Sequence, residues 1–115
     1  LSPGFGSNTT TLTAGGSIQA NRGSCTYGFV ASAPDLKLNY EGTGPLYFSV
    51  ESDGDTTLLV NQPDVSWICD DDSLGDSNPL LVLPNATEGV YDIWVGTYGD
   101  QMQSATLTIS ETDPR

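Results

Sequence analysis

Apolar and polar residues alternate over short segments of this chain, and the period of two recurs along most of its length. The clearest segment is 36–40, in which Leu36, Leu38 and Tyr40 face one way and the residues between them face the other. Three further inward rows follow the same rule: Leu46, Phe48 and Val50; Tyr91, Ile93 and Val95; and Ala105, Leu107 and Ile109. No window shows a helical period, and turn-forming residues recur about every eight to twelve positions. The sequence therefore predicts an all-β fold, a sandwich of two antiparallel sheets.

Two segments give less regular patterns. Residues 25–31 predict a strand with Tyr27, Phe29 and Ala31 on one face. Residues 80–83 form a continuous apolar run between two prolines, which predicts a strand buried on both faces.

The length of 115 residues fits one domain, which buries about two-thirds of the surface of its unfolded chain. The first residues, 1–8, are rich in turn formers and predict a linker or N-terminal arm. We expect residues 9–111 to form a single β-sandwich domain and residues 112–115 to form a tail.

The charge of the chain excludes several classes of partner. The formal net charge is −12, and the basic residues are Arg22, Lys37 and Arg115 alone. Binding to nucleic acid or to an anionic membrane surface requires clustered Lys and Arg, so we expect neither. No stretch approaches the roughly 20 apolar residues of a membrane span, so we expect no membrane insertion. The isolated domain is expected to be a monomer.

The two cysteines, Cys25 and Cys69, do not fit a zinc site, because the chain has no His and a tetrahedral site needs four nitrogen or sulfur ligands. A disulfide is the favoured use. It would close a loop of about 45 residues and stabilise the fold by about 4 kcal/mol. A disulfide implies an oxidising location: secreted, periplasmic or at the cell surface. The alternative is a pair of reduced, buried thiols.

An acidic stretch follows Cys69 and has no Lys or Arg within it. Crowded carboxylates repel one another unless a cation lies among them, and a hard divalent cation such as calcium prefers oxygen ligands. A second acidic pair precedes the strand predicted at 56–61. The candidate calcium ligands are Asp53, Asp55, Asp70, Asp71, Asp72, Asp76 and Asn78. The alternative is a solvated acidic loop that binds no ion.

Four segments occur in the order and spacing of a known family. Residues 46–50 read Leu-Tyr-Phe-Ser-Val, and residues 55–60 read Asp-Thr-Thr-Leu-Leu-Val. Residues 69–72 read Cys-Asp-Asp-Asp, followed by Asn-Pro at 78–79, and residues 89–95 read Gly-Val-Tyr-Asp-Ile-Trp-Val. In these features the chain resembles the bacterial pre-peptidase C-terminal (PPC) domains.

The resemblance covers roughly residues 15–111 and implies a secreted, jelly-roll-like accessory domain. Such domains are attached to proteases and other exported enzymes, and some bind calcium or adhere to a substrate. Asp55 matches the aspartate that opens a strand in the family, and Asp70 with Asp71 or Asp72 matches its paired acids. The implied partners are a parent catalytic domain and an extracellular protein or polysaccharide. The cysteine pair and the triple Asp depart from the usual family pattern.

The residue types argue against an enzyme. Without His, the usual base of a Ser-His-Asp triad is missing. Paired carboxylates can hydrolyse glycosides, but a chain this short and rich in strands leaves little room for a sugar-shaped cleft. We therefore expect a non-catalytic domain.

A second hypothesis is a carbohydrate- or protein-binding module. Trp94 alternates away from the inward row of its strand, which favours an outward position beside Trp67 or Tyr98. Exposed aromatic rings are surfaces on which sugars and partner proteins stack. The alternative is that residues 1–14 cover this face and make Trp94 part of the core.

Overall fold

The computed structural model describes residues 4–20, 25, 28–71, 73–74, 78–99 and 102–112. This part of the chain contains ten strands and no helix, and it has no segment that meets the criteria of length and hydropathy for a membrane-spanning helix. The strands are β1 (Ser7–Ala14), β2 (Ile18–Gln19), β3 (Phe29–Val30), β4 (Leu36–Tyr40), β5 (Gly44–Glu51), β6 (Thr56–Asn61), β7 (Trp67–Asp70), β8 (Leu80–Ala86), β9 (Gly89–Thr97) and β10 (Gln103–Ser110). The all-β prediction is confirmed.

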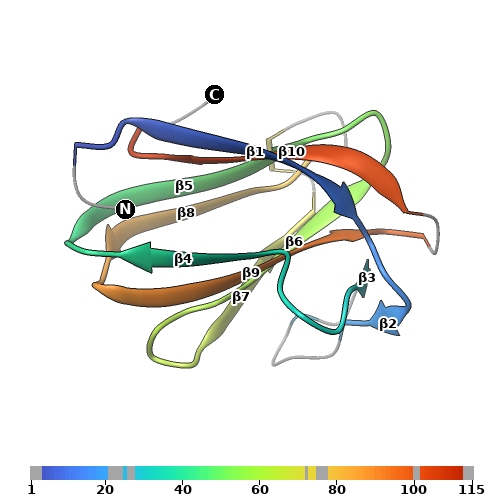
Figure 1. Cartoon of the computed structure of the whole chain (residues 1–115), viewed down its shortest axis with the longest axis horizontal. Coiled ribbons are helices and arrows are strands. Elements are labelled where there is room, and N and C mark those ends of the chain that lie inside the picture. Colours follow the sequence, from blue (N-terminus) through green and yellow to red (C-terminus); the bar gives the residue numbers. More distant parts are fainter. Residues whose placement is uncertain are drawn as a thin grey trace.

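The strands form two antiparallel sheets that pack face to face (Figure 1). One sheet has four strands in the order β1-β10-β5-β8. The other has six strands, in the order β2-β3-β9-β6-β7 with β4 also paired to β9. The predicted two-sheet sandwich is therefore confirmed.

The strand pairs are nested in the sequence. The outermost pair is β1 with β10, and inside it lie β4 with β9, β5 with β8 and β6 with β7. The same nesting is found when one long antiparallel hairpin is rolled up into two sheets. The rolled hairpin is closed by two further antiparallel pairs, β10 with β5 and β9 with β6. An eight-stranded double sheet of this kind is a jelly roll, in which β2, β3 and β4 together take the place of one strand.

The core lies between the sheets and contains the predicted inward rows. Leu46, Phe48 and Val50 are fully buried, as are Tyr91, Ile93 and Val95. The residues Leu38, Tyr40, Ala105, Leu107 and Ile109 are also buried. All eleven belong to one apolar cluster. Alternation with a single buried face was therefore a correct guide to the core.

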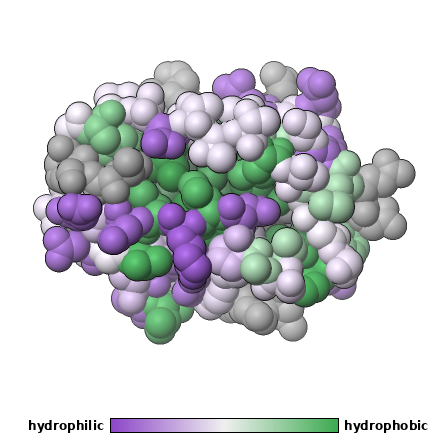
Figure 2. All heavy atoms as spheres, in the orientation of Figure 1, coloured by the Kyte–Doolittle hydropathy of each residue, from purple (hydrophilic) through white to green (hydrophobic). Residues whose placement is uncertain are grey.

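The seam between the edge strands β1 and β4 leaves part of this core visible. Figure 2 shows hydrophobic residues in the gap, with near-neutral residues along β1 on one side and hydrophilic residues over β4 on the other. A groove of about 260 Å³ lies there, with Leu36, Leu38 and Ile109 among its lining residues. The core between the two sheets is thus partly open to solvent along the seam between β1 and β4.

The strand predicted at 25–31 is shorter than expected. Within that range β3 covers only Phe29 and Val30. Val30 is buried and Phe29 is half-buried. Tyr27 lies outside the described residues. Pairing decides the length, because β3 contacts β9 through the single register pair Phe29 and Thr97.

The prediction that residues 80–83 are buried on both faces is wrong. The strand β8 lies at the end of the four-stranded sheet, and among the described strands it pairs with β5 alone. Val82 is 38% exposed on its outer face. An edge strand also tolerates Pro84, whose missing amide hydrogen is not needed on the unpaired side.

The first strand begins at Ser7, two residues before the predicted boundary. The amides of Gly4 and Gly6 donate hydrogen bonds to the two carboxylate oxygens of Glu111, each at 2.8 Å. The amide of Glu111 in turn donates to the carbonyl of Gly6 at 2.9 Å. These bonds fasten residues 4–6 to the end of β10.

Candidate functional site

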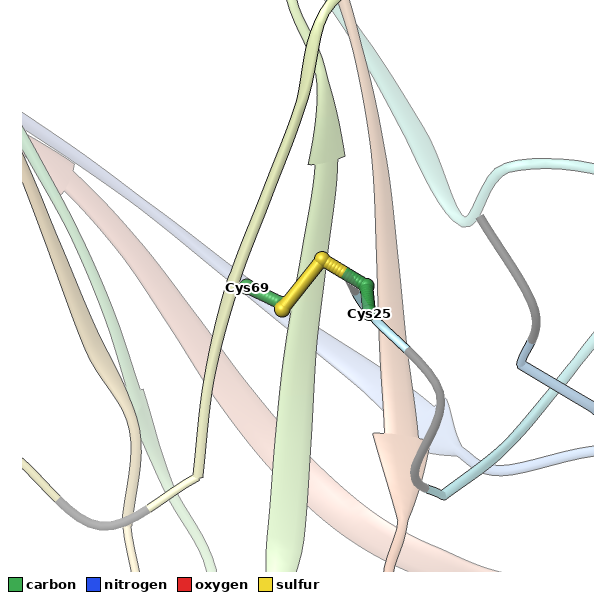
Figure 3. The surroundings of a disulfide bond; sticks show 2 residues. All are labelled: Cys25 and Cys69. Atoms are coloured by element: carbon green, nitrogen blue, oxygen red, sulfur yellow. A yellow bond between two sulfur atoms is a disulfide. The ribbon is translucent and has the colours of Figure 1, made fainter. Parts of the chain in front are cut away.

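A disulfide joins Cys25 to Cys69, as the sequence predicted. The two Cα atoms are 5.9 Å apart, and Cys25 is 2% exposed. Figure 3 shows the bond crossing over β6, from Cys69 on β7 to the segment that carries Cys25. It therefore fixes Cys25 against the outer face of the six-stranded sheet.

A second apolar cluster lies around the disulfide, on the outer face of the sheet. Its buried members are Ala20, Cys25 and Leu59, and its partly buried members are Trp67, Cys69 and Trp94. Leu59 of β6 lies in register between Cys69 of β7 and Trp94 of β9. The Trp67 and Trp94 rings pack at 5.4 Å between centroids and an interplanar angle of 38°. The face opposite the core is thus apolar at this place.

A hollow opens beside the two tryptophans, and we name it the aromatic hollow. It has a volume of about 70 Å³. Its lining residues are Ile18, Gln19, Ala20, Val30, Ala31, Ser32, Leu59, Trp67 and Trp94. None of these residues carries a charge, and Gln19 and Ser32 are its polar side chains. The hollow can therefore receive an apolar group but supplies no acid, base or metal ligand.

The structure brings two of the three predicted aromatic residues together. Trp67 and Trp94 share the aromatic hollow and are both half-buried. Tyr98 is 52% exposed and does not line this hollow. The alternative in which the N-terminal residues cover Trp94 is wrong for residues 7–14, because β1 pairs with β10 in the opposite sheet. Trp67 and Ala20 cover part of Trp94 instead.

The carboxylate of Asp70 organises the acidic loop through main-chain donors. Its Oδ2 accepts hydrogen bonds from the amides of Ser73 and Leu80, both at 2.9 Å. Its Oδ1 accepts one from the Ser73 hydroxyl at 2.8 Å. Asp70 thereby ties the end of β7 to the loop and to the first residue of β8.

The other predicted calcium ligands are only partly placed. Asp72 and Asp76 lie outside the described residues. Among the described residues, Asp53, Asp55, Asp70 and Asp71 included, no three His, Cys, Asp or Glu side chains group closely enough to hold a metal ion. The full ligand set therefore stays a prediction.

Asp53 and Asn78 do meet, at a polar depression that we name the acidic hollow. It measures about 340 Å³ and is lined by Glu51, Ser52, Asp53, Asn78, Ser104, Ala105 and Thr106. The Asn78 Oδ1 accepts a hydrogen bond from the Ser52 amide at 3.1 Å, which fixes Asn78 beside the residue that follows β5. Sequence reasoning missed Glu51 as a candidate ligand, although alternation along 46–51 places its side chain outward beside Asp53.

Comparisons with protein-family models, with curated proteins and with solved structures find no match to this chain. The similarity to PPC domains therefore stays a prediction from the sequence.

Proposed function

We propose that this chain is a non-catalytic binding domain of an exported protein and that the aromatic hollow is its ligand site. The observation that carries the proposal is the position of the hollow. Trp67 and Trp94 lie on the outer face of a sheet, outside the main core, beside a segment held down by the disulfide. Aromatic side chains in a preformed concave site are typical of ligand binding.

The chemistry of the hollow favours binding over catalysis. Its lining residues include no titratable side chain and no nucleophile other than the Ser32 hydroxyl. An isolated hydroxyl without an adjacent base is a weak nucleophile. The ligand group is therefore an apolar one, such as an aliphatic side chain of an extracellular protein or the CH face of a polysaccharide unit.

The disulfide is compatible with an oxidising compartment, which supports a secreted, periplasmic or cell-surface location. The resemblance to PPC domains supports an accessory role beside a parent catalytic domain. The domain would then hold that enzyme on a substrate or stabilise it.

The experiment is a fluorescence titration, because Trp67 and Trp94 are the only tryptophans. Soluble oligosaccharides and short peptides would be added to the wild type and to Ser32→Phe, which fills the exposed rim of the hollow. A ligand that changes the fluorescence of the wild type but not that of Ser32→Phe supports the proposal. Tyr98→Ala is the matched control, because Tyr98 is an exposed aromatic residue outside the hollow. A ligand whose affinity is unchanged by Ser32→Phe contradicts the aromatic hollow as the site.

Trp94→Ala separates a binding residue from a core residue. Lost binding with an unchanged melting temperature supports the module. A large fall in melting temperature means that Trp94 serves the fold.

Calcium binding is the second candidate function, and one observation favours it. Glu51, Asp53 and Asn78, whose side chains carry oxygen atoms, all line the acidic hollow. Calcium prefers six to eight such oxygen ligands, including water, at flexible geometry. An ion bound only by the folded state would raise stability as RT ln(1 + [L]/Kd).

Thermal melts in EDTA, in millimolar calcium and in millimolar magnesium test this candidate. A rise of several degrees in calcium alone, abolished by Asp53→Asn, supports it. Asp92→Asn is the matched control, since Asp92 pairs with Lys37 at 2.9 Å on another part of the surface. Equal melting temperatures in all three solutions would make the acidic stretch a solvated loop.

A further inference from the structure

The short strand β2 has one unpaired side. The amide of Ala20 donates to the carbonyl of Gly28 at 2.9 Å, and Ile18 lies in register with Val30. Hydrogen bonding alternates along an antiparallel pair. The main-chain N–H and C=O of Gln19 therefore point away from β3, and no described strand pairs with that side of β2.

Two hollows flank this strand pair, one on each face. Val30 lines the aromatic hollow, on the face that carries Trp94. Phe29, which alternates to the opposite face, lines a second hollow of about 640 Å³ that we name the methionine hollow. Its lining residues are Gly15, Gly16, Ser17, Phe29, Ala31, Ser32 and Met102. Ala31 and Ser32 line both hollows and form the wall between them.

The described residues that line the two hollows beside β2 are uncharged and mostly apolar, in contrast to the chain as a whole. Ile18 is 45% exposed and Met102 is 59% exposed. None of the described residues that line either hollow carries a charge. Exposed apolar side chains beside uncharged hollows of this kind are typical of an interaction surface.

We propose that the free side of β2 and the two hollows together bind an extended peptide of another protein. The peptide adds to β2 as a further strand, and the main chain of Gln19 supplies a donor and an acceptor to it. Successive side chains of a strand point to opposite faces, so neighbouring apolar residues enter the aromatic and the methionine hollow in turn. The inference rests on the proposed function, since it names the ligand class of the aromatic hollow.

Charge decides between another protein and a second copy of this chain. Two copies carry −12 each and repel one another. A peptide with Lys or Arg on both sides of its apolar residues is attracted instead, and its encounter is faster at low salt. The occupant is therefore a basic segment with an apolar centre.

The test uses a fluorescein-labelled peptide, Lys-Lys-Val-Leu-Val-Leu-Lys-Lys, and fluorescence polarisation with the whole chain. Gln19→Pro removes the outward amide hydrogen and leaves the Ala20 to Gly28 bond in place. Gln19→Ala, the matched control, keeps the main chain intact. Both variants remove the Gln19 side chain, which lines the aromatic hollow, so their difference isolates the amide hydrogen. We expect Gln19→Pro to bind the peptide about tenfold more weakly than Gln19→Ala, the effect of losing one main-chain hydrogen bond.

Two altered peptides test the same contacts without changing the protein. N-methylation of the central residues blocks strand addition and is expected to abolish binding to the wild type. Val and Leu alternate in the peptide and therefore lie on opposite faces of the strand. Replacing each Leu by Ser leaves apolar side chains for one hollow only, so we expect it to weaken binding. These peptides test the inference even if Gln19→Pro does not fold. The melting curve of that variant shows whether it folds.

The outcomes separate this inference from the proposed function. Equal binding of the N-methylated and unmodified peptides overturns strand addition. A change in tryptophan fluorescence that Ser32→Phe removes still supports the aromatic hollow, because Trp67 and Trp94 line that hollow and not the methionine hollow. Binding of oligosaccharides but not of the peptide also overturns the inference and leaves the hollow as a sugar site. If the wild type self-associates and Gln19→Pro abolishes the self-association, the occupant is a second copy of the chain, and the inference of a peptide from another protein is overturned. If neither peptide nor sugar responds to Ser32→Phe, both proposals fail.

Discussion

The hydroxyl of Tyr91 forms two hydrogen bonds with the main chain of Thr87: it donates to the carbonyl at 2.6 Å and accepts from the amide at 2.9 Å. The pair closes the turn between β8 and β9. Tyr40 is equally buried, yet its hydroxyl has no hydrogen-bond partner in the described part of the chain. Burial, followed by the negative charge of Glu111, raises the pKa of Tyr40 above its usual value.

The two tyrosines should respond oppositely to loss of the hydroxyl. Tyr91→Phe leaves the Thr87 amide and carbonyl unpaired, so we expect the free energy of unfolding to fall by about 1–3 kcal/mol. Tyr40→Phe removes a buried polar group that has no partner, so we expect no change or a gain of about 1 kcal/mol. Chemical denaturation measures both variants. A similar loss in both would contradict the difference between the hydroxyls.

The contacts of Asp70 predict a structural role that needs no ion. Asp70→Ala leaves the amides of Ser73 and Leu80 without their acceptor, and we expect a loss of about 1–3 kcal/mol. Ser73→Ala, which removes only the hydroxyl bond, should cost about 1 kcal/mol. Both losses should be equal in EDTA and in calcium, as measured by urea unfolding. A loss confined to calcium would show instead that Asp70 binds an ion.

The disulfide predicts a large effect on stability. Cys25 and Cys69 are 44 residues apart in the sequence, so the bond constrains a long loop of the unfolded chain. We expect Cys25→Ala combined with Cys69→Ala to lower the free energy of unfolding by about 4 kcal/mol. The wild type treated with a reductant is the control and should lose a similar amount. A loss below about 1 kcal/mol would show that the loop stays ordered without the bond.

The Glu111 carboxylate predicts a pH-dependent attachment of residues 4–6. The amides of Gly4 and Gly6 hold the pKa of Glu111 below its usual value of 4.5. A carboxyl group whose pKa is lowered by folding stabilises the folded state at pH values above its pKa in the unfolded chain. This stabilisation is lost as the pH falls through the pKa of the folded state. The amide proton signals of Gly4 and Gly6 should therefore shift together in an NMR titration below pH 4.5. Glu111→Gln should remove this titration, and its persistence in the variant would assign it to another group.

The sequence predicted the strands whose two faces differ. The row of Tyr91, Ile93 and Val95 alternates with more polar residues, so its buried face was evident. The apolar run in β8 carries no such information, because whether a strand is central or at an edge depends on its partners. For β8 that partner is β5 alone, a fact set by pairing between distant segments.

The site was predictable only where single residues carried the information. The number of cysteines and the absence of His favoured the disulfide, and alternation placed Trp94 outward. The aromatic hollow was not predictable, because its walls come from segments that meet only in the folded sheet: 18–20, 30–32, Leu59 and the two tryptophans. The role of Asp70 was missed for the same reason, since one of its donors, Leu80, lies ten residues further along the chain.

The nested strand pairs also set an order in which the chain can assemble. The entropy lost on closing a loop grows with its length, and contacts between distant residues form slowly. The pair β6 and β7 closes over a short turn, whereas β1 must wait for β10 near the other end of the sequence. We therefore expect pairing to proceed outward from β6 and β7. During synthesis, β1 stays without its partner until the chain has emerged as far as Ser110.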